Sequence, residues 1–349
     1  MSDWNSFLVA QGATFSPDGI SDFVTVSEDT NKTWLVDLSH QGILAIEGPD
    51  AAKFLQGQVT CDVRELENKT TRLGAQCDLK GRMLHSFRAL QPTADQILLR
   101  LNAGLIGAAQ SALGKYIVFS KAKLHDRSDS CRQIGLSGPN AADLLTRHLG
   151  VPPQSPEQWT EHSGNLIIKL DEQRYECWIK PEQAEHLWQA LAPDCQLGGG
   201  NIWRLLDIRA GIGEVLPSTQ GVFTPQALNF QLINGVSFRK GCYTGQEIVA
   251  RLHYRGKLKR HMYRVQFELG NDALLPDSGA SVFNQQQKAV GEIVMAARVC
   301  GNMAEALAVI ADDQLEQSYL GSQSSQSSQS SQKLTPLALP YAIPVEKED

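Results

Sequence analysis

An internal repeat constrains the fold of this chain more than any other feature of its sequence. Residues 42–55 have the pattern of a strand, a Gly48-Pro49 turn and an amphipathic helix, and residues 134–145 repeat it, with Gly138 lying 90 residues after Gly48. A period of this length is too long for a solenoid. The repeat therefore predicts two related α+β subdomains packed as a pair.

Each copy continues with strands and helices in an order that is typical of ferredoxin-like units. Apolar runs of five residues or so indicate strands, and longer amphipathic segments indicate helices. The predicted strands lie at 97–101, 116–119, 166–170 and 175–179, the last two as a hairpin, and the predicted helices at 105–113, 182–192 and 201–211.

The pattern changes after Arg260 to short apolar runs separated by turn residues. Such runs predict a small C-terminal β-barrel, and a Ser/Gln-rich stretch within it predicts a disordered insert. The N-terminal residues are polar without a sustained period, which predicts an extended arm. The predicted organisation is an arm at 1–30, an α+β domain at 31–255 with halves of about 31–125 and 126–255, and a barrel at 256–349 with its insert at 321–333.

The composition excludes several classes of protein. A net charge of -6 with 42% hydrophobic and 20% charged residues is typical of a globular protein. No basic segment precedes an apolar stretch at the N-terminus, and no window approaches ~18 uninterrupted apolar residues, which predicts a cytoplasmic protein without membrane contact. The seven cysteines are scattered without a C-x-x-C pair, which argues against a disulfide framework and against a metal site.

Residues 240–247, with the sequence KGCYTGQE, carry the densest candidate chemistry. Thr244 and Glu247 have the spacing of a capping box, which predicts a helix that begins here with Thr244 as its cap. Cys242 would then lie just before a helix N-terminus and beside Lys240, and both positive charges would favour a reactive thiolate. The alternative is that Cys242 is a small residue in a tight turn.

A basic run follows this segment. No acidic residue occurs from 248 to 267, whereas six basic residues do: Arg251, Arg255, Lys257, Lys259, Arg260 and Arg264. The run predicts a positive face for a polyanion such as RNA phosphate or an oligoglutamate chain. The alternative is a solvated helix end and edge strand, with Gly256 as the helix stop.

Trp203 lies at the edge of the helix predicted at 201–211. A tryptophan at such a position is most often part of the core. Its indole face, beside Arg204, is also suited to stack on a planar heterocycle. Both interpretations stay open at the level of the sequence.

Residues 240–247 resemble the signature motif, KGCYxGQE, of the YgfZ-type folate-binding proteins, which are relatives of the glycine-cleavage T-protein. The resemblance spans about residues 35–345 and includes four further segments, at 57–63, 77–83, 115–121 and 223–230. It implies a tandem ferredoxin-like, T-protein-like folate-binding domain followed by a small β-barrel. It also implies tetrahydrofolate, or a one-carbon derivative of it, as the cofactor.

The resemblance assigns the motif cysteine of the family to Cys242, with Lys240, Tyr243 and Gln246 as its neighbours in the motif.

For the folate contacts, a family tryptophan falls on Trp203. A second one falls on Gln41, which cannot stack in the same way, and Trp34 lies nearby in the sequence. True aminomethyltransferases place a folate-contacting glutamate two residues after a proline. Here Gln226 follows Pro225 and is the candidate hydrogen-bonding partner of the pterin.

The function that the resemblance implies is that of an accessory protein for iron–sulfur cluster maintenance and tRNA modification. Its partners would be iron–sulfur enzymes such as those that thiolate tRNA, and Cys242 would be its essential thiol. True aminomethyltransferases carry an acidic pair shortly after the glycine that matches Gly81, whereas this chain has Leu84-His85-Ser86. Aminomethyl transfer is therefore not expected.

Two other hypotheses stay open. One is a folate-dependent one-carbon transferase, for aminomethyl or methyl groups, in which Cys242 or His85 replaces the missing acid. The other is an RNA-binding module that makes transient contact with tRNA through the basic run at 251–264.

Overall fold

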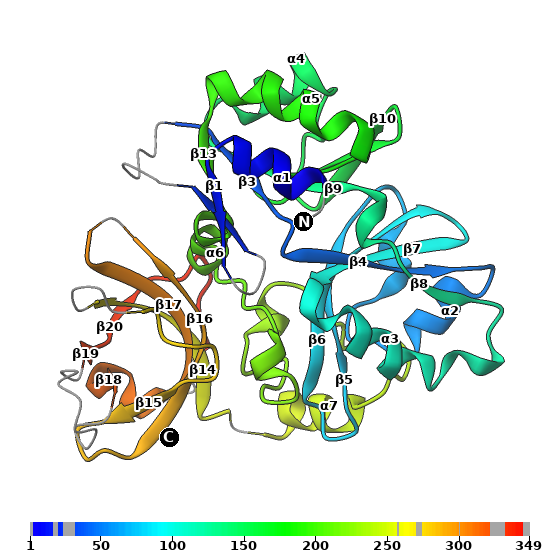
Figure 1. The fold of residues 1–349 in the computed structure, drawn as a ribbon. Coiled ribbons are helices and arrows are strands. Elements are labelled where there is room, and N and C mark those ends of the chain that lie inside the picture. The colour runs from blue at the N-terminus through cyan, green and yellow to red at the C-terminus, as the bar shows by residue number, and fades with distance from the viewer. Residues whose placement is uncertain are drawn as a thin grey trace. The chain divides into compact units, whose positions relative to one another are not determined.

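The chain forms two compact units and passes between them several times (Figure 1). Unit 1 contains Met1–Gln56, Asp62–Arg72 and Phe87–Trp203, and unit 2 contains Gly57–Cys61, Leu73–Ser86 and Arg204–Asp349. The computed structural model describes residues 3–16, 20–23, 32–256, 258–269, 274–299, 301–321 and 332–344.

Unit 1 contains a six-stranded sheet with the strand order β10-β11-β12-β9-β3-β13. Helices α1, α4 and α5 share one apolar core with the side chains that β9 and β12 direct to the same face. The strands are β3 (Trp34–Asp37), β9 (Arg132–Ser137), β10 (Gln158–His162), β11 (Asn165–Lys169), β12 (Arg174–Ile179) and β13 (Gln196–Gly198), and the helices are α1 (Asp3–Ala10), α4 (Ala141–His148) and α5 (Pro181–Leu191). A separate two-stranded sheet pairs β1 (Ala13–Phe15) with β2 (Ser21–Phe23).

A five-stranded sheet has the order β5-β6-β7-β4-β8. Strand β4 pairs antiparallel with β7 along its whole length and with β8 on its other side. The division between the units falls within this sheet, because Leu73–Ser86 belongs to unit 2. The elements are β4 (Gln41–Glu47), β5 (Arg72–Cys77), β6 (Met83–Thr93), β7 (Gln96–Asn102), β8 (Lys123–Asp126), α2 (Ala51–Gln56) and α3 (Ile106–Gly114).

The Gly-Pro turns of the repeat lie at the same place in both copies, after β4 and before α2, and after β9 and before α4. Gly48 and Gly138 have φ angles of 133° and 137°, a conformation that L side chains rarely adopt. A Cβ on Gly48 would lie 2.3 Å from the carbonyl oxygen of Lys121, and one on Gly138 would lie 2.7 Å from that of Lys32. The same backbone approach therefore requires glycine twice, and the predicted repeat of an α+β unit is confirmed.

Unit 2 contains a seven-stranded sheet, of order β19-β18-β15-β16-β17-β14-β20, that is nearly closed into a barrel. Its apolar core runs from Val265 on β14 to Leu334 after β19. This confirms the predicted C-terminal β-barrel. The strands are β14 (Arg260–Glu268), β15 (Ser281–Asn284), β16 (Ala289–Arg298), β17 (Met303–Ala311), β18 (Ser318–Leu320), β19 (Gln332–Lys333) and β20 (Thr335–Leu337). Helix α7 (Gln246–Tyr254) also belongs to unit 2, and helix α6 (Gly200–Arg209) contains the division between the units, after Trp203.

Two predictions about irregular segments need correction. Residues 3–10 of the predicted extended arm form helix α1, because Trp4 and Leu8 recur at helical spacing and both are buried. The indole of Trp4 also donates to the Asp37 carboxylate at 2.9 Å. In the Ser/Gln insert, Gln332 and Lys333 form β19, which pairs with β18, while residues 322–331 lie outside the described part of the chain.

The strand predicted at 116–119 is wrong as well. Ile117–Phe119 forms a 3₁₀ turn, with the amide of Ser120 donating to the carbonyl of Ile117. Val118 and Phe119 are exposed, so the apolar run does not mark a buried strand here. A short apolar run without alternation does not distinguish a strand from an exposed turn.

A buried ion pair links the six-stranded sheet to the five-stranded sheet within unit 1. The guanidinium of Arg100 on β7 donates to both carboxylate oxygens of Glu176 on β12, at 3.1 and 3.0 Å. The indole of Trp178 also donates to this carboxylate, at 2.8 Å. The carboxylate of Glu176 is fully buried, so it depends on these donors for its solvation.

We expect Arg100→Leu to lower the free energy of unfolding by about 3–5 kcal/mol, because it leaves the Glu176 carboxylate buried without its counter-ion. The matched control is Arg127→Leu, which removes the arginine partner of Glu47 in an exposed pair and should have a much smaller effect. Urea unfolding followed by circular dichroism measures both. Equal losses for the two variants would contradict the role given to the buried pair.

Candidate functional site

The motif residues 240–247 form a loop that leads into helix α7. The N-cap of this helix is Gly245, with a φ of 84° and no side-chain cap, so the prediction of Thr244 as the cap is wrong. The Thr244 hydroxyl instead lies 3.4 Å from Oε1 of Gln58. A Cβ on Gly245 would come within 2.4 Å of the carbonyl oxygen of Asp78, which leaves room only for glycine at this turn.

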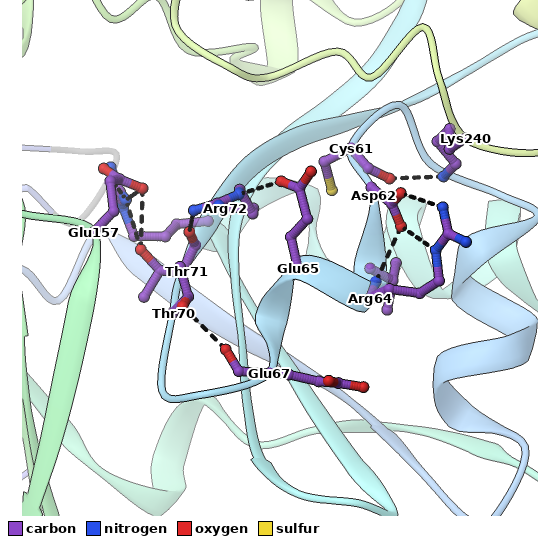
Figure 2. A network of polar contacts seen from close by, with 12 residues as sticks. Cys61, Asp62, Arg64, Glu65, Glu67, Thr70, Thr71, Arg72, Glu157 and Lys240 are labelled. Atoms are coloured by element: carbon purple, nitrogen blue, oxygen red, sulfur yellow. Dashed lines mark hydrogen bonds and ion pairs between the residues drawn. The ribbon is translucent and has the colours of Figure 1, made fainter.

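The side chain of Lys240 anchors the motif loop from inside unit 2. It is buried, and its ammonium donates to the carbonyl oxygens of Val59 at 2.7 Å and Cys61 at 2.6 Å; Figure 2 shows the bond to Cys61. The ammonium also lies 5.2 Å from the centroid of the Tyr243 ring. These contacts position the loop, and the predicted effect of Lys240 on the Cys242 thiol stays a prediction.

A second motif segment packs against the start of α7. The turn at 78–82 is closed by the carboxylate of Asp78, which accepts from the amides of Lys80 and Arg82 at 2.8 and 2.9 Å. Gly81 in this turn has a φ of 71°, and a Cβ there would lie 3.0 Å from Cβ of Ile248 on α7. The segments 77–83 and 240–247, far apart in the sequence, therefore meet in unit 2, where α7 lies beside the ends of β5 and β6 (Figure 1).

Cys242 differs from the other cysteines that the structure describes in being exposed. Burial raises the pKa of the Cys77, Cys131 and Cys195 thiols to about 12 and raises that of Cys177 further. Because the thiolate is the nucleophilic form, these four thiols are inert near neutral pH. Exposure thus selects Cys242 as the candidate nucleophile, and its side chain is accessible to a partner or ligand.

Tyr243 and Gln246, the motif neighbours of Cys242, make contacts that stabilise the fold of the loop. Tyr243 is buried. Burial is the larger cause that raises the pKa of its phenol, and the nearby thiols of Cys77 and Cys61 add to the effect. Gln246 is the first residue of α7, and its amide donates to the carbonyl of Tyr243 at 3.1 Å. Both residues therefore shape the turn from which Cys242 projects.

Gln226 and His85 are buried in unit 2. Nε2 of Gln226 donates to the carbonyl of Val249 on α7 at 2.6 Å, while its Oε1 has no hydrogen-bond partner among the described residues. Nε2 of His85 lies 2.9 Å from Oε1 of Gln76, and burial lowers the pKa of the imidazole to about 4. His85 is therefore neutral near pH 7.

The two candidate folate residues of unit 1 adjoin one strand. The carbonyl of Gln41, at the start of β4, accepts a hydrogen bond from Gln133 of β9 at 2.9 Å. The ring of Trp203, on α6, lies against Gly135 of β9, where a Cβ would come within 2.4 Å of Cζ3. Because residues two apart in a strand face the same side, Gln41 and Trp203 lie along the same face of β9.

The indole of Trp203 is 1% exposed, with the guanidinium carbon of Arg174 5.4 Å from its ring centroid. Its Nε1 and the Oε1 of Gln133 have no hydrogen-bond partner within the described part of the chain. A buried polar atom without a partner calls for an explanation, such as an ordered water or a bound group. Gln133 was missed by the sequence analysis. Its position as the polar residue in the otherwise apolar strand segment Gln133–Leu136 was the signal that could have identified it. Trp34, the tryptophan near Gln41 in the sequence, is the first residue of β3 and is buried.

Only part of the predicted basic run presents free positive charge, because two of its arginines are paired with acidic residues. Arg260 pairs with Glu292 of β16, and Arg264 with Glu305 of β17 at 2.8 Å, because adjacent strands bring acidic partners from distant sequence. Arg251, Arg255 and Lys259 are exposed, and within the described residues no ion pair engages them. Lys257 lies outside the described residues. The positive face is therefore centred on the C-terminal end of α7.

Comparison with known proteins identifies the family. A model of the GCVT N-terminal domain matches residues 26–157. The tRNA-modifying protein YgfZ of Photobacterium profundum is 38% identical over 251 residues, which cover 70% of this chain and 74% of that protein. The chain belongs to the YgfZ family. The protein of the same name from Colwellia psychrerythraea is 30% identical over 284 residues, which cover 81% of this chain and 86% of that protein. The one from Pectobacterium carotovorum is 31% identical over 314 residues, which cover 88% of this chain and 92% of that protein.

The fold of this YgfZ family member has a solved counterpart. The glycine cleavage system aminomethyltransferase T from Bartonella henselae has a TM-score of 0.73 and 17% identity, over 97% of this chain and 96% of that chain. At this level of identity the likeness shows the fold alone, and it confirms the predicted T-protein-like architecture. Among the described residues, no group of His, Cys, Asp and Glu side chains is arranged to hold a metal ion, and none of the helices has the length and apolar character needed to cross a membrane.

We expect iodoacetamide at pH 7.5 to alkylate Cys242 at least about tenfold faster than Cys77 or Cys177, because the buried thiols are protonated and shielded. Peptide mapping by mass spectrometry after timed quenching measures each site. The urea-unfolded chain is the control, in which all three sites should react alike. Labelling of Cys77 as fast as Cys242 in the folded protein would refute the assignment.

Proposed function

We propose that this YgfZ family member is a folate-binding accessory protein of tRNA modification, which supports iron–sulfur enzymes that thiolate tRNA and maintains their clusters. Cys242 is its essential thiol. The observation that carries the proposal is the exposed Cys242 on a loop that Lys240 and Gly245 hold in one conformation. The relatives named tRNA-modifying protein support the process. We propose the cytoplasm as the place where the protein acts.

The buried polar atoms beside β9 fit a folate. A pterin ring presents both hydrogen-bond donors and acceptors along its edge, and the unpaired Trp203 Nε1 and Gln133 Oε1 supply one donor and one acceptor. We propose that these two residues, with Gln41 beside them, hold the pterin of tetrahydrofolate or of a one-carbon derivative. A separate candidate, within unit 2, is Gln226, whose Oε1 is likewise unpaired among the described residues. A bound tetrahydrofolate would supply a carrier for one-carbon units.

The alternative of a one-carbon transferase is less well supported by the side chains at 84–86. His85 is buried and neutral, with its Nε2 at Gln76, and the hydroxyl of Ser86 accepts from the amide of Val215 at 2.9 Å. Neither side chain is a carboxylic acid, so neither replaces the acidic pair of true aminomethyltransferases. We therefore favour an accessory role over aminomethyl or methyl transfer.

In a strain that lacks the endogenous protein, we expect Cys242→Ser to restore less than about a tenth of the thiolated tRNA nucleosides that the wild type restores, because a hydroxyl is a far weaker nucleophile and ligand than a thiolate. Mass spectrometry of digested tRNA measures the nucleosides. Cys131→Ser, a change at a half-buried thiol, is the matched control and should restore the wild-type level. Full restoration by Cys242→Ser would show that the thiol is not essential.

The folate site is tested by calorimetric titration of tetrahydrofolate into the wild type and Trp203→Phe. The variant keeps an aromatic ring but loses the indole donor, and we expect binding to weaken about threefold to tenfold, the value of one hydrogen bond. The matched control is Trp159→Phe, since Trp159 of β10 is also buried with an unpaired Nε1 in the described structure. Equal affinities for both variants would place the folate elsewhere, and no binding by folded wild type would refute the cofactor.

A further inference from the structure

Three aromatic side chains form a cluster at the C-terminal end of α7 in unit 2. Phe238 and His253 stack with ring centroids 3.7 Å apart and planes 10° apart. Tyr254 meets both rings edge-on, at 6.1 Å from Phe238 and 4.7 Å from His253. Tyr254 is 68% exposed, so its ring contributes little to the core and offers a face to a ligand.

Exposed arginines border this aromatic cluster. Arg251 precedes Tyr254 and Arg255 by three and four residues, a spacing that places them on one side of the helix end. Arg239 follows Phe238 directly in the chain. All three arginines are exposed, and no ion pair engages them among the described residues. The surface thus combines an open aromatic face with positive charges that the fold does not use.

We propose that this surface binds a single-stranded segment of RNA. An unpaired base stacks on Tyr254, which the His253 and Phe238 rings support, and Arg239, Arg251 and Arg255 contact the flanking phosphates. Single-stranded nucleic acids are bound in this way because every base has a flat π-face and every linkage carries a negative charge. The inference rests on the proposed role in tRNA modification for the choice of RNA as the nucleic acid.

A purely electrostatic site for an acidic chain is the competing account. It would need the arginines but not the aromatic rings, because an acidic side chain has no ring to stack. The exposed Tyr254 lies among the charges rather than away from them, and this juxtaposition favours a ligand with both a base and a phosphate. In a duplex the base faces are stacked on their neighbours, so the site selects unpaired nucleotides.

Fluorescence anisotropy with a labelled heptamer of adenosine tests the proposal on the full chain. We expect Tyr254→Leu, which keeps an apolar side chain but removes the ring, to weaken binding about tenfold. Tyr254→Trp keeps an aromatic ring at this position and should bind the RNA as tightly as the wild type. The double variant Arg251→Gln, Arg255→Gln should lower the slope of log affinity against log salt by about 1.4, the value for two phosphate contacts. Tyr116→Leu changes an exposed tyrosine of unit 1 and is the matched control. The same RNA in a duplex, and a heptamer of glutamate as competitor, complete the set.

Four outcomes would overturn the proposal. Wild-type affinity in Tyr254→Leu together with weaker binding by the arginine variant would show a phosphate site without stacking. Binding of the duplex as tight as that of the single strand, or displacement by the glutamate heptamer at equal concentration, would show a general anion site. No binding of the single strand by folded wild type would remove the site altogether. None of these outcomes bears on the effect of Cys242→Ser on tRNA thiolation, so a failure here is distinguishable from a failure of the proposed function.

Discussion

The geometry of the motif loop depends on one buried cation. The ammonium of Lys240 lies out of contact with bulk water, and such a charge is tolerated only where hydrogen bonds replace its hydration. The carbonyls of Val59 and Cys61 supply them at 2.7 and 2.6 Å, and Val59 is bridged in turn to Gln76 of β5. The loop is thereby tied to the same strand whose end leads into the turn at Asp78. An aliphatic residue in place of Lys240 would leave these carbonyls without their donor, and the loop would lose the hydrogen bonds that fix its position.

The features that the sequence predicted correctly are those that depend on local constraints. The Gly48 and Gly138 turns could be recognised because each Gly-Pro pair stands between an apolar run and an amphipathic segment, although the backbone contacts that require these glycines join residues far apart in the chain. The cap of α7 could not, since the contact between Gly245 and the Asp78 carbonyl joins residues far apart in the chain. The same holds for Arg260 and Arg264, whose partners come from neighbouring strands. Tertiary contacts, which no local pattern encodes, decided each of these cases.

The candidate folate residues show a similar limit. Trp203 was recognised by type, yet its surroundings follow from Gly135, whose missing side chain admits the indole against β9. Gln133, two residues before Gly135 on β9, has the other unpaired atom, its Oε1. A strand period of two places both residues on one face, but the position of α6 against that face is set by packing. The identity of a family residue could therefore be predicted from the sequence, whereas the polar atoms around it could not.

The motif loop and α7 form one structural element, with the aromatic cluster at one end and the N-cap of the helix at the other. Phe238, before the loop, stacks on His253 near the C-terminal end of the helix, and Gly245, at the end of the loop, is the N-cap. The loop therefore runs back along a helix of 9 residues, a length of about 13 Å. Lys240 fixes it between these two points, and Cys242 projects from the fixed stretch. A ligand that stacks on Tyr254 would bind to the same element that presents the thiol, so the position of the aromatic cluster relative to Cys242 is set by the fold and needs no conformational change.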